Sequence, residues 1–128
     1  SLKLIKKISK RASEETRMFP VLLEVNTSGE KQKHGFLPSE TDEMLRCFDE
    51  PCVNVEGLMT VGPLTQDRQK IRESFKRLKE LEATINNHLG HDQLKELSMG
   101  MSGDYEIAIE EGSTMIRVGT ALFGNRNK

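Results

Sequence analysis

Two short apolar segments near the C-terminus each end in glycine and hydroxyl residues, a combination suited to binding an anion. Ser102 and Gly103 follow one segment, and Gly119 and Thr120 follow the next. Small residues let backbone N–H groups approach an anion closely, and the N-terminus of a following helix adds favourable partial charge. The sequence therefore predicts a phosphate site shared by the two turns. The alternative is a helix cap at Ser102 and an ordinary strand exit. A helix cap alone would explain Ser102, but not two neighbouring strands that both end in glycine and hydroxyl residues.

Arg117 is a charged residue in the middle of the second apolar segment, residues 114–118. An unpaired charge is costly to bury. The side chain therefore either points outward or faces a cavity that holds an anion or another acceptor, and the sequence leaves both alternatives open.

Residues 26–30 (Asn-Thr-Ser-Gly-Glu) form a third polar feature, followed closely by residues 33–35 (Lys-His-Gly). A polar loop at the C-terminal end of a strand suits the rim of a ligand site, and an ordinary connecting loop fits equally well. His88 and His91 are three residues apart, but Gly90 breaks the helix that would align them. No metal site is therefore expected.

The elements that position these residues alternate between helices and strands. Apolar residues at helical spacing predict helices over residues 2–12, 39–48, 67–89 and 104–111. Short apolar runs predict strands over residues 19–26, 53–60, 94–99 and 114–118. The third helix is expected to be capped by Thr65 or Asp67 and ended by Gly90. Strands separated by helices imply parallel crossovers. We therefore expect an α/β fold, a parallel sheet of four βα units in one domain over residues 1–128.

Composition excludes several classes of protein. The net charge is −1, with 35% hydrophobic and 30% charged residues, which argues against broad electrostatic binding to nucleic acid. No run of about 18 apolar residues is present, so no membrane span is expected. Two cysteines, Cys47 and Cys52, are too few for a disulfide framework or a zinc site. Reduced thiols in a cytoplasmic protein are the expectation.

The C-terminal third also carries a longer pattern in a fixed order. Residues 97–104 read LSMGMSGD, residues 112–114 GST and residues 117–124 RVGTALFG, after VNTSGE at 25–30, KHGF at 33–36 and GLMT at 57–60. This pattern resembles the signature of the pyridoxal-phosphate homeostasis proteins, single-domain relatives of the alanine racemase barrel. The matching segments run in family order over nearly the whole chain.

The resemblance implies a TIM-type (β/α)8 barrel of the alanine racemase type that binds pyridoxal 5′-phosphate (PLP) at the C-terminal ends of its strands. On that analogy Ser102, Gly119 and Thr120 hold the phosphate, Arg117 contacts the pyridine nitrogen, and Met99 and Met101 lie near the ligand. An arginine there would keep the nitrogen unprotonated and make the ring a weaker electron sink. The family is regarded as a carrier or regulator of the cofactor, so intracellular PLP homeostasis is the expected function. A PLP-dependent enzyme similar to amino-acid racemases is the alternative.

The front half of the family pattern is absent from this chain. It would contain the Schiff-base lysine in a Val-Ser-Lys motif and a Gly-Glu-Asn segment, and residues 8–10 (Ile-Ser-Lys) match only superficially within a helical pattern. By family order the four strands correspond to strands five to eight, and a complete barrel needs about 250 residues. We therefore expect the C-terminal half of a barrel, truncated on its N-terminal side and without catalytic activity of its own. Its open sheet edges favour a homodimer or pairing with the missing N-terminal half.

Overall fold

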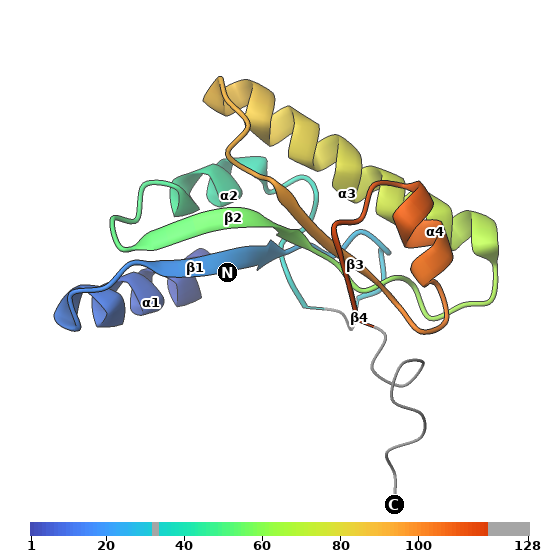
Figure 1. Cartoon of the computed structure of the whole chain (residues 1–128), viewed down its shortest axis with the longest axis horizontal. Coiled ribbons are helices and arrows are strands. Elements are labelled where there is room, and N and C mark those ends of the chain that lie inside the picture. The colour runs from blue at the N-terminus through green and yellow to red at the C-terminus, as the bar shows by residue number, and fades with distance from the viewer. Residues whose placement is uncertain (32–33, 118–128) are drawn as a thin grey trace, which may run out of the picture.

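Four parallel strands form one sheet in a computed structural model that describes residues 1–31 and 34–117 (Figure 1). The strands β1 (Phe19–Glu24), β2 (Val53–Met59), β3 (Glu96–Met101) and β4 (Met115–Arg117) lie in the sheet in chain order. The helices α1 (Leu2–Glu14), α2 (Thr41–Cys47), α3 (Arg68–Leu89) and α4 (Tyr105–Glu110) alternate with them. The predicted α/β fold and the parallel sheet of four strands are confirmed.

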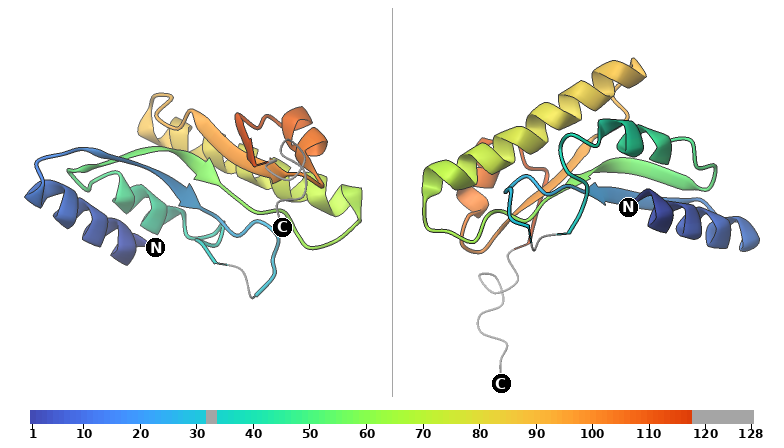
Figure 2. Two further views of the ribbon diagram at one scale, coloured as in Figure 1. Left: turned by 60° about the horizontal axis from the view of Figure 1, so that its bottom comes forward. Right: turned by 180° about the vertical axis from the view of Figure 1, so that it is seen from behind.

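One face of the sheet is covered by helices. Along β2, Val53 and Val55 are buried, whereas Asn54 is half-buried and Glu56 is exposed. Side chains alternate between the two faces of a strand, and β2 is an internal strand of the sheet, so the face that carries Glu56 is open among the described residues. All four helices contribute to a single hydrophobic core on the other face. In Figure 2, α1 and α2 lie side by side, and α3 runs along the part of the sheet that β2 and β3 form.

The ends of α3 are fixed by two residues that the sequence identified. Asp67 caps the helix, since its side chain accepts hydrogen bonds from the backbone N–H groups of Gln69 (3.0 Å) and Lys70 (3.4 Å). Thr65 instead accepts from the N–H of Asp67, which decides between the two predicted caps. Gly90 ends the helix at φ 80°, a left-handed conformation that glycine adopts without strain.

The apolar stripe of α3 is buried against the sheet. Its members are Ile71, Phe75, Leu78, Leu81 and Ile85. The stripe therefore belongs to the core and is not a docking surface for another protein.

The predicted third strand, residues 94–99, is observed over Glu96–Met101, and the predicted cap of the fourth helix is wrong. The third strand begins at Glu96 rather than at Leu94, because the Asn86 side chain occupies both backbone polar groups of Leu94, accepting from its N–H (2.8 Å) and donating to its carbonyl (2.9 Å). Ser102 does not cap α4. Asp104 holds the N-cap position, and Ser102 lies in the turn before it.

The fourth strand was predicted over residues 114–118 and is described over Met115–Arg117. Val118 and the last predicted turn, residues 121–123, lie outside the described residues. Within residues 1–31 and 34–117, no helix is long and apolar enough to cross a membrane.

Among the described residues, the outer edge of β1 is covered only at its C-terminal end. Phe36 forms a parallel bridge there, donating to the carbonyl of Glu24 (2.8 Å) and accepting from the N–H of Asn26 (2.7 Å). Gly35 permits this approach, because any Cβ at its φ of 104° would meet the Glu24 carbonyl. Further toward the start of the strand, Pro20 has no N–H to offer, a feature found at sheet edges.

Candidate functional site

The C-terminal ends of the strands bring several of the predicted site residues together. Met101 is paired with Arg117 in the register of β3 and β4, and Ser102 directly follows Met101. Three of the predicted residues are therefore neighbours. Two others, Gly119 and Thr120, lie outside the described residues.

Arg117 reaches across the sheet from β4. Its Nη1 donates to Ser98 Oγ on β3 (3.0 Å), and its Nη2 donates to the carbonyl of Thr60 after β2 (3.3 Å). The side chain is therefore held by acceptors of the sheet itself, which resolves the alternatives that the sequence left open.

The guanidinium lies on the open face of the sheet. Leu97 and Met99 are fully buried in the core, and successive side chains of a strand point to opposite faces. Ser98, which lies between them, therefore points to the open face, and Arg117 meets it there. A guanidinium has five N–H donors, so two contacts leave donors for a ligand.

The turn after β3 is open to solvent. Met101 is 44% exposed, Ser102 and Gly103 are exposed, and nothing would lie within 4 Å of a Cβ at Gly103. A hydrogen bond stabilises the turn, since Asp104 Oδ1 accepts from the backbone N–H of Met101 (2.7 Å). Within residues 1–31 and 34–117, no protein atoms would have to move for a ligand to approach Ser102.

The loop after β1 is organised by the buried side chain of Asn26. Its Oδ1 accepts from the backbone N–H (3.2 Å) and the hydroxyl (3.0 Å) of Ser28, and its Nδ2 donates to the carbonyl of Glu30 (2.8 Å). These bonds give residues 26–30 a fixed shape at the same end of the sheet as Arg117. The position fits the predicted rim of a ligand site, although no described contact joins this loop to Ser102.

Sequence reasoning missed a buried cluster of hydroxyls beneath these loops. Thr27 Oγ1 lies 2.6 Å from Ser74 Oγ and 3.0 Å from Thr60 Oγ1. Arg77 on α3 also donates to the carbonyl of Thr27 (2.9 Å). The available signal was Ser74, a small polar residue within the apolar stripe of α3.

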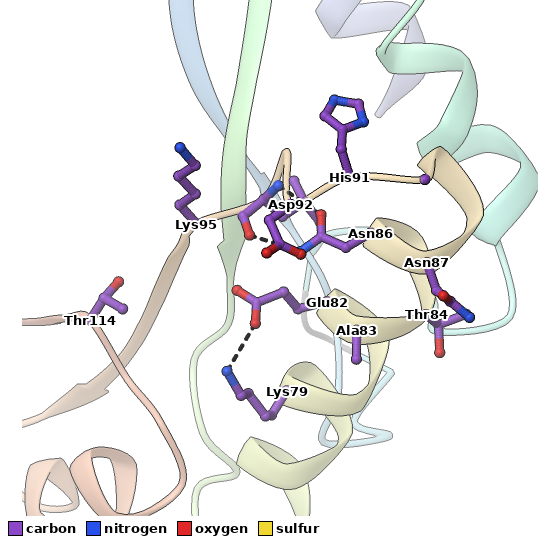
Figure 3. Close-up of a pocket in the computed structure, with 12 residues that line it drawn as sticks. Lys79, Glu82, Ala83, Thr84, Asn86, Asn87, His91, Asp92, Lys95 and Thr114 are labelled. Atoms are coloured by element: carbon purple, nitrogen blue, oxygen red, sulfur yellow. Dashed lines mark hydrogen bonds and ion pairs between the residues drawn. The ribbon is translucent and has the colours of Figure 1, made fainter.

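An open cavity of about 890 Å³ lies elsewhere (Figure 3). It is walled by the second half of α3, residues 90–95 and Thr114. In Figure 3 Lys79 reaches toward Glu82, with 3.0 Å between Nζ and Oε1. Lys95 and Thr114 precede β3 and β4, so the cavity is at the N-terminal ends of these strands. It contains none of the predicted site residues.

The two cysteines are free, and Cys47 is buried on α2. Burial raises the pKa of the Cys47 thiol to about 11. A thiol that remains protonated is a poor nucleophile, so Cys47 is a core residue and not a reactive group.

The chain is similar to known proteins over nearly its whole length. The pyridoxal phosphate homeostasis protein of Aquifex aeolicus is 41% identical over 124 residues, which are 96% of this chain and 54% of that protein. PipY of Synechococcus elongatus superimposes with a TM-score of 0.89 without PLP (32% identity, 97% of this chain and 58% of that one). With PLP bound, its TM-score is 0.84 (30% identity, 97% of this chain and 57% of that one).

The fold extends to more distant proteins. An alanine racemase of Clostridium difficile has a TM-score of 0.79 at 18% identity, covering 100% of this chain and 34% of that one, a likeness of fold alone. The chain spans about half the length of the curated relatives that it matches. The family model "Alanine racemase, N-terminal domain" matches residues 1–127. On this match, the chain belongs to the family of the alanine racemase N-terminal domain.

Proposed function

We propose that this chain binds PLP and takes part in intracellular PLP homeostasis as a carrier or regulator of the cofactor. The observation that carries the proposal is Arg117, held at the C-terminal ends of the strands with its guanidinium on the open face of the sheet. The relative from Aquifex aeolicus, which is named a pyridoxal phosphate homeostasis protein, and the PLP-bound PipY structure support the choice of ligand.

The proposed contacts divide between the two ends of the cofactor. Ser102, Gly119 and Thr120 would hold the phosphate, Arg117 would donate to the pyridine nitrogen, and Met101 would lie beside the ring. The exposed turn at Ser102 and the donors that Arg117 retains fit these roles.

Arg117 also bears on the kind of chemistry to expect. When bound, PLP supplies an electron sink whose strength depends on protonation of its ring nitrogen. A guanidinium keeps its own proton in proteins, so Arg117 can donate a hydrogen bond but does not protonate the ring. This arrangement supports a role in carrying PLP rather than in catalysis. We place this role in the cytoplasm, a choice supported by the free thiols Cys47 and Cys52.

We further propose that the four strands occupy the places of strands five to eight in a barrel of the alanine racemase type, as one partial domain over residues 1–128. The open face at Glu56 and the half-length match to the relatives support this assignment. A groove of about 460 Å³ between α1 and β1, lined in part by Leu4, Ile8 and Leu22, marks where the barrel wall would continue. A second copy of the chain or the N-terminal half of the barrel would pair there.

Titration with PLP and with pyridoxal, which lacks the phosphate, tests the proposed function. We expect saturable, reversible binding of PLP and affinity for pyridoxal lower by about tenfold or more, since charge-assisted bonds to phosphate are among the stronger contacts. Addition of borohydride should leave no stoichiometric adduct on any lysine of this chain. Failure of PLP to saturate the chain contradicts the proposed ligand, and an adduct at a single lysine contradicts the assignment to strands five to eight.

A further inference from the structure

Three hydroxyl side chains from three different elements meet in the core beneath the C-terminal ends of β1 and β2. Thr27 follows β1, Thr60 follows β2 and Ser74 is on α3, and each is at most 1% exposed. Their oxygens are joined by contacts of 2.6 Å (Ser74 to Thr27) and 3.0 Å (Thr27 to Thr60). We refer to Ser74, Thr27 and Thr60 as the hydroxyl chain.

The direction of every hydrogen bond in the hydroxyl chain follows from counting protons. Thr60 Oγ1 lies 2.7 Å from the carbonyl of Val25, and a carbonyl only accepts. Each hydroxyl has a single proton, so Thr60 donates to Val25 and must accept from Thr27. Thr27 has then used its proton and must accept from Ser74. The chain therefore runs in one direction, from Ser74 through Thr27 and Thr60 to the Val25 carbonyl.

The hydroxyl chain ends on the residue whose backbone holds Arg117. The carbonyl of Thr60 accepts from Arg117 Nη2 (3.3 Å), while the N–H of Thr60 donates to the carbonyl of Ser98 (3.0 Å). Ser98 in turn provides the second acceptor for Arg117, through its hydroxyl. Both anchors of the guanidinium thus depend on where Thr60 lies, and the hydroxyl chain fixes Thr60 to β1 and α3.

We infer that Thr27 and Ser74 are positioning residues, which orient Arg117 toward the pyridine nitrogen of PLP through Thr60 without touching the ligand. The inference rests on the proposed function for its ligand. Buried polar groups are costly to leave unpaired, so the three hydroxyls hold β1, β2 and α3 in one defined arrangement, which apolar packing would not impose.

Removing the central hydroxyl is the direct test. In Thr27→Val, which keeps the shape of the side chain, Ser74 loses its acceptor and Thr60 loses its donor. We expect the PLP dissociation constant to rise by about three- to tenfold, the effect of one or two lost hydrogen bonds. Thr27→Ser retains the hydroxyl and should bind PLP as the wild type does. Thr84→Val is the matched control, because Thr84 is exposed on α3 and its hydroxyl bonds only within the helix, to Glu80.

Two readouts separate positioning from general loss of structure. Phenyl phosphate shares the phosphate of PLP and lacks the ring nitrogen, so Thr27→Val should weaken PLP binding and leave phenyl phosphate binding unchanged. In the double variant with Arg117→Gln, Thr27→Val should cause no further loss, since residues that act through one another are not additive. Equal weakening of both ligands, or additive losses, overturns the inference.

Arg117 can also be observed without any ligand. Hydrogen bonds hinder rotation of a guanidinium, so 15N spectra of labelled arginine should show slow rotation for Arg117 in the wild type and in Thr84→Val, and fast rotation in Thr27→Val. Arg117→Lys assigns the signal. Unchanged rotation in Thr27→Val overturns the inference. If the wild type binds no PLP, the proposed function fails while this measurement still decides the positioning role.

Discussion

Arg117 on β4 and Ser98 on β3 are joined by a hydrogen bond of 3.0 Å between Nη1 and Oγ. Ser98 is paired with Met115, two residues before Arg117, so the contact runs diagonally across the β3–β4 ladder, whose register shifts between Ser98 and Met101. The contact places a permanent cation on the open face of the sheet, next to the exposed turn at Ser102. This relationship is the centre of the proposed PLP site.

The first prediction concerns the anchor itself. In Ser98→Ala, Arg117 retains only the Thr60 carbonyl, so its guanidinium samples more orientations. We expect the PLP dissociation constant to rise by about tenfold or more, since a hydrogen bond to a charged group contributes about 1.5–3 kcal/mol. Isothermal titration measures the change. Ser13→Ala, an exposed serine on α1, is the control, and equal affinity in Ser98→Ala and wild type would count against the role of this contact.

The second prediction concerns the cap of α3. Asp67→Ala leaves the N–H groups of Gln69 and Lys70 without their carboxylate acceptor. The free energy of unfolding should fall by about 1 kcal/mol, the usual cost of losing an N-cap side chain. Urea denaturation monitored by circular dichroism measures it. Gln66→Ala, a change at the exposed neighbouring residue, should cause a smaller loss, and the same loss in both variants would contradict the capping role.

The helices and strands were largely predictable from local sequence. In α3 the apolar stripe, Asp67 and Gly90 all indicate the same helix, so its bounds follow without tertiary information. The start of β3 was not predictable, because it depends on Asn86, whose side chain occupies the backbone of Leu94 from eight residues away. Local periodicity contains no signal for such a contact.

The candidate site was only partly predictable, for a similar reason. The sequence identified Arg117 as a charge in an apolar strand, but its acceptors, Ser98 and Thr60, lie 19 and 57 residues away. The hydroxyl chain joins residues 33 and 47 positions apart. Which hydroxyls meet is set by sheet register and helix packing, so these partners became visible only in the folded chain.

The third prediction concerns the two thiols. Burial raises the pKa of Cys47 to about 11, so at pH 8 its thiol is both protonated and inaccessible. Iodoacetamide should therefore modify Cys52, which is half-buried, and leave Cys47 unmodified until the protein is unfolded. Mass spectrometry of peptides after labelling identifies the modified cysteine. Modification of Cys47 in the native protein at a rate comparable to that of Cys52 would be inconsistent with the packing of α2.

The same shift predicts how stability depends on pH. A pKa raised from 9.0 to about 11 in the folded protein means that the unfolded chain loses its thiol proton first. The contribution of Cys47 is therefore complete below pH 9 and is lost as the pH rises toward 11. Urea denaturation should show a steeper loss of stability over this range in wild type than in Cys47→Ala. Cys52→Ser is the control and should follow the wild type.

The last prediction concerns the groove between α1 and β1. Leu4 is 55% exposed at its rim, and β1 has an outer edge that Phe36 covers only at one end. Apolar side chains beside an open strand edge favour association, so sedimentation velocity should show a mass that rises with protein concentration. Leu4→Glu places a charge in the groove and should shift the equilibrium to monomer. Leu64→Glu is the matched control, because Leu64 is 92% exposed and lies in the segment before α3. A folded wild-type chain that sediments as a monomer at all concentrations would exclude pairing between copies and leave the N-terminal half of the barrel as the proposed partner of this edge.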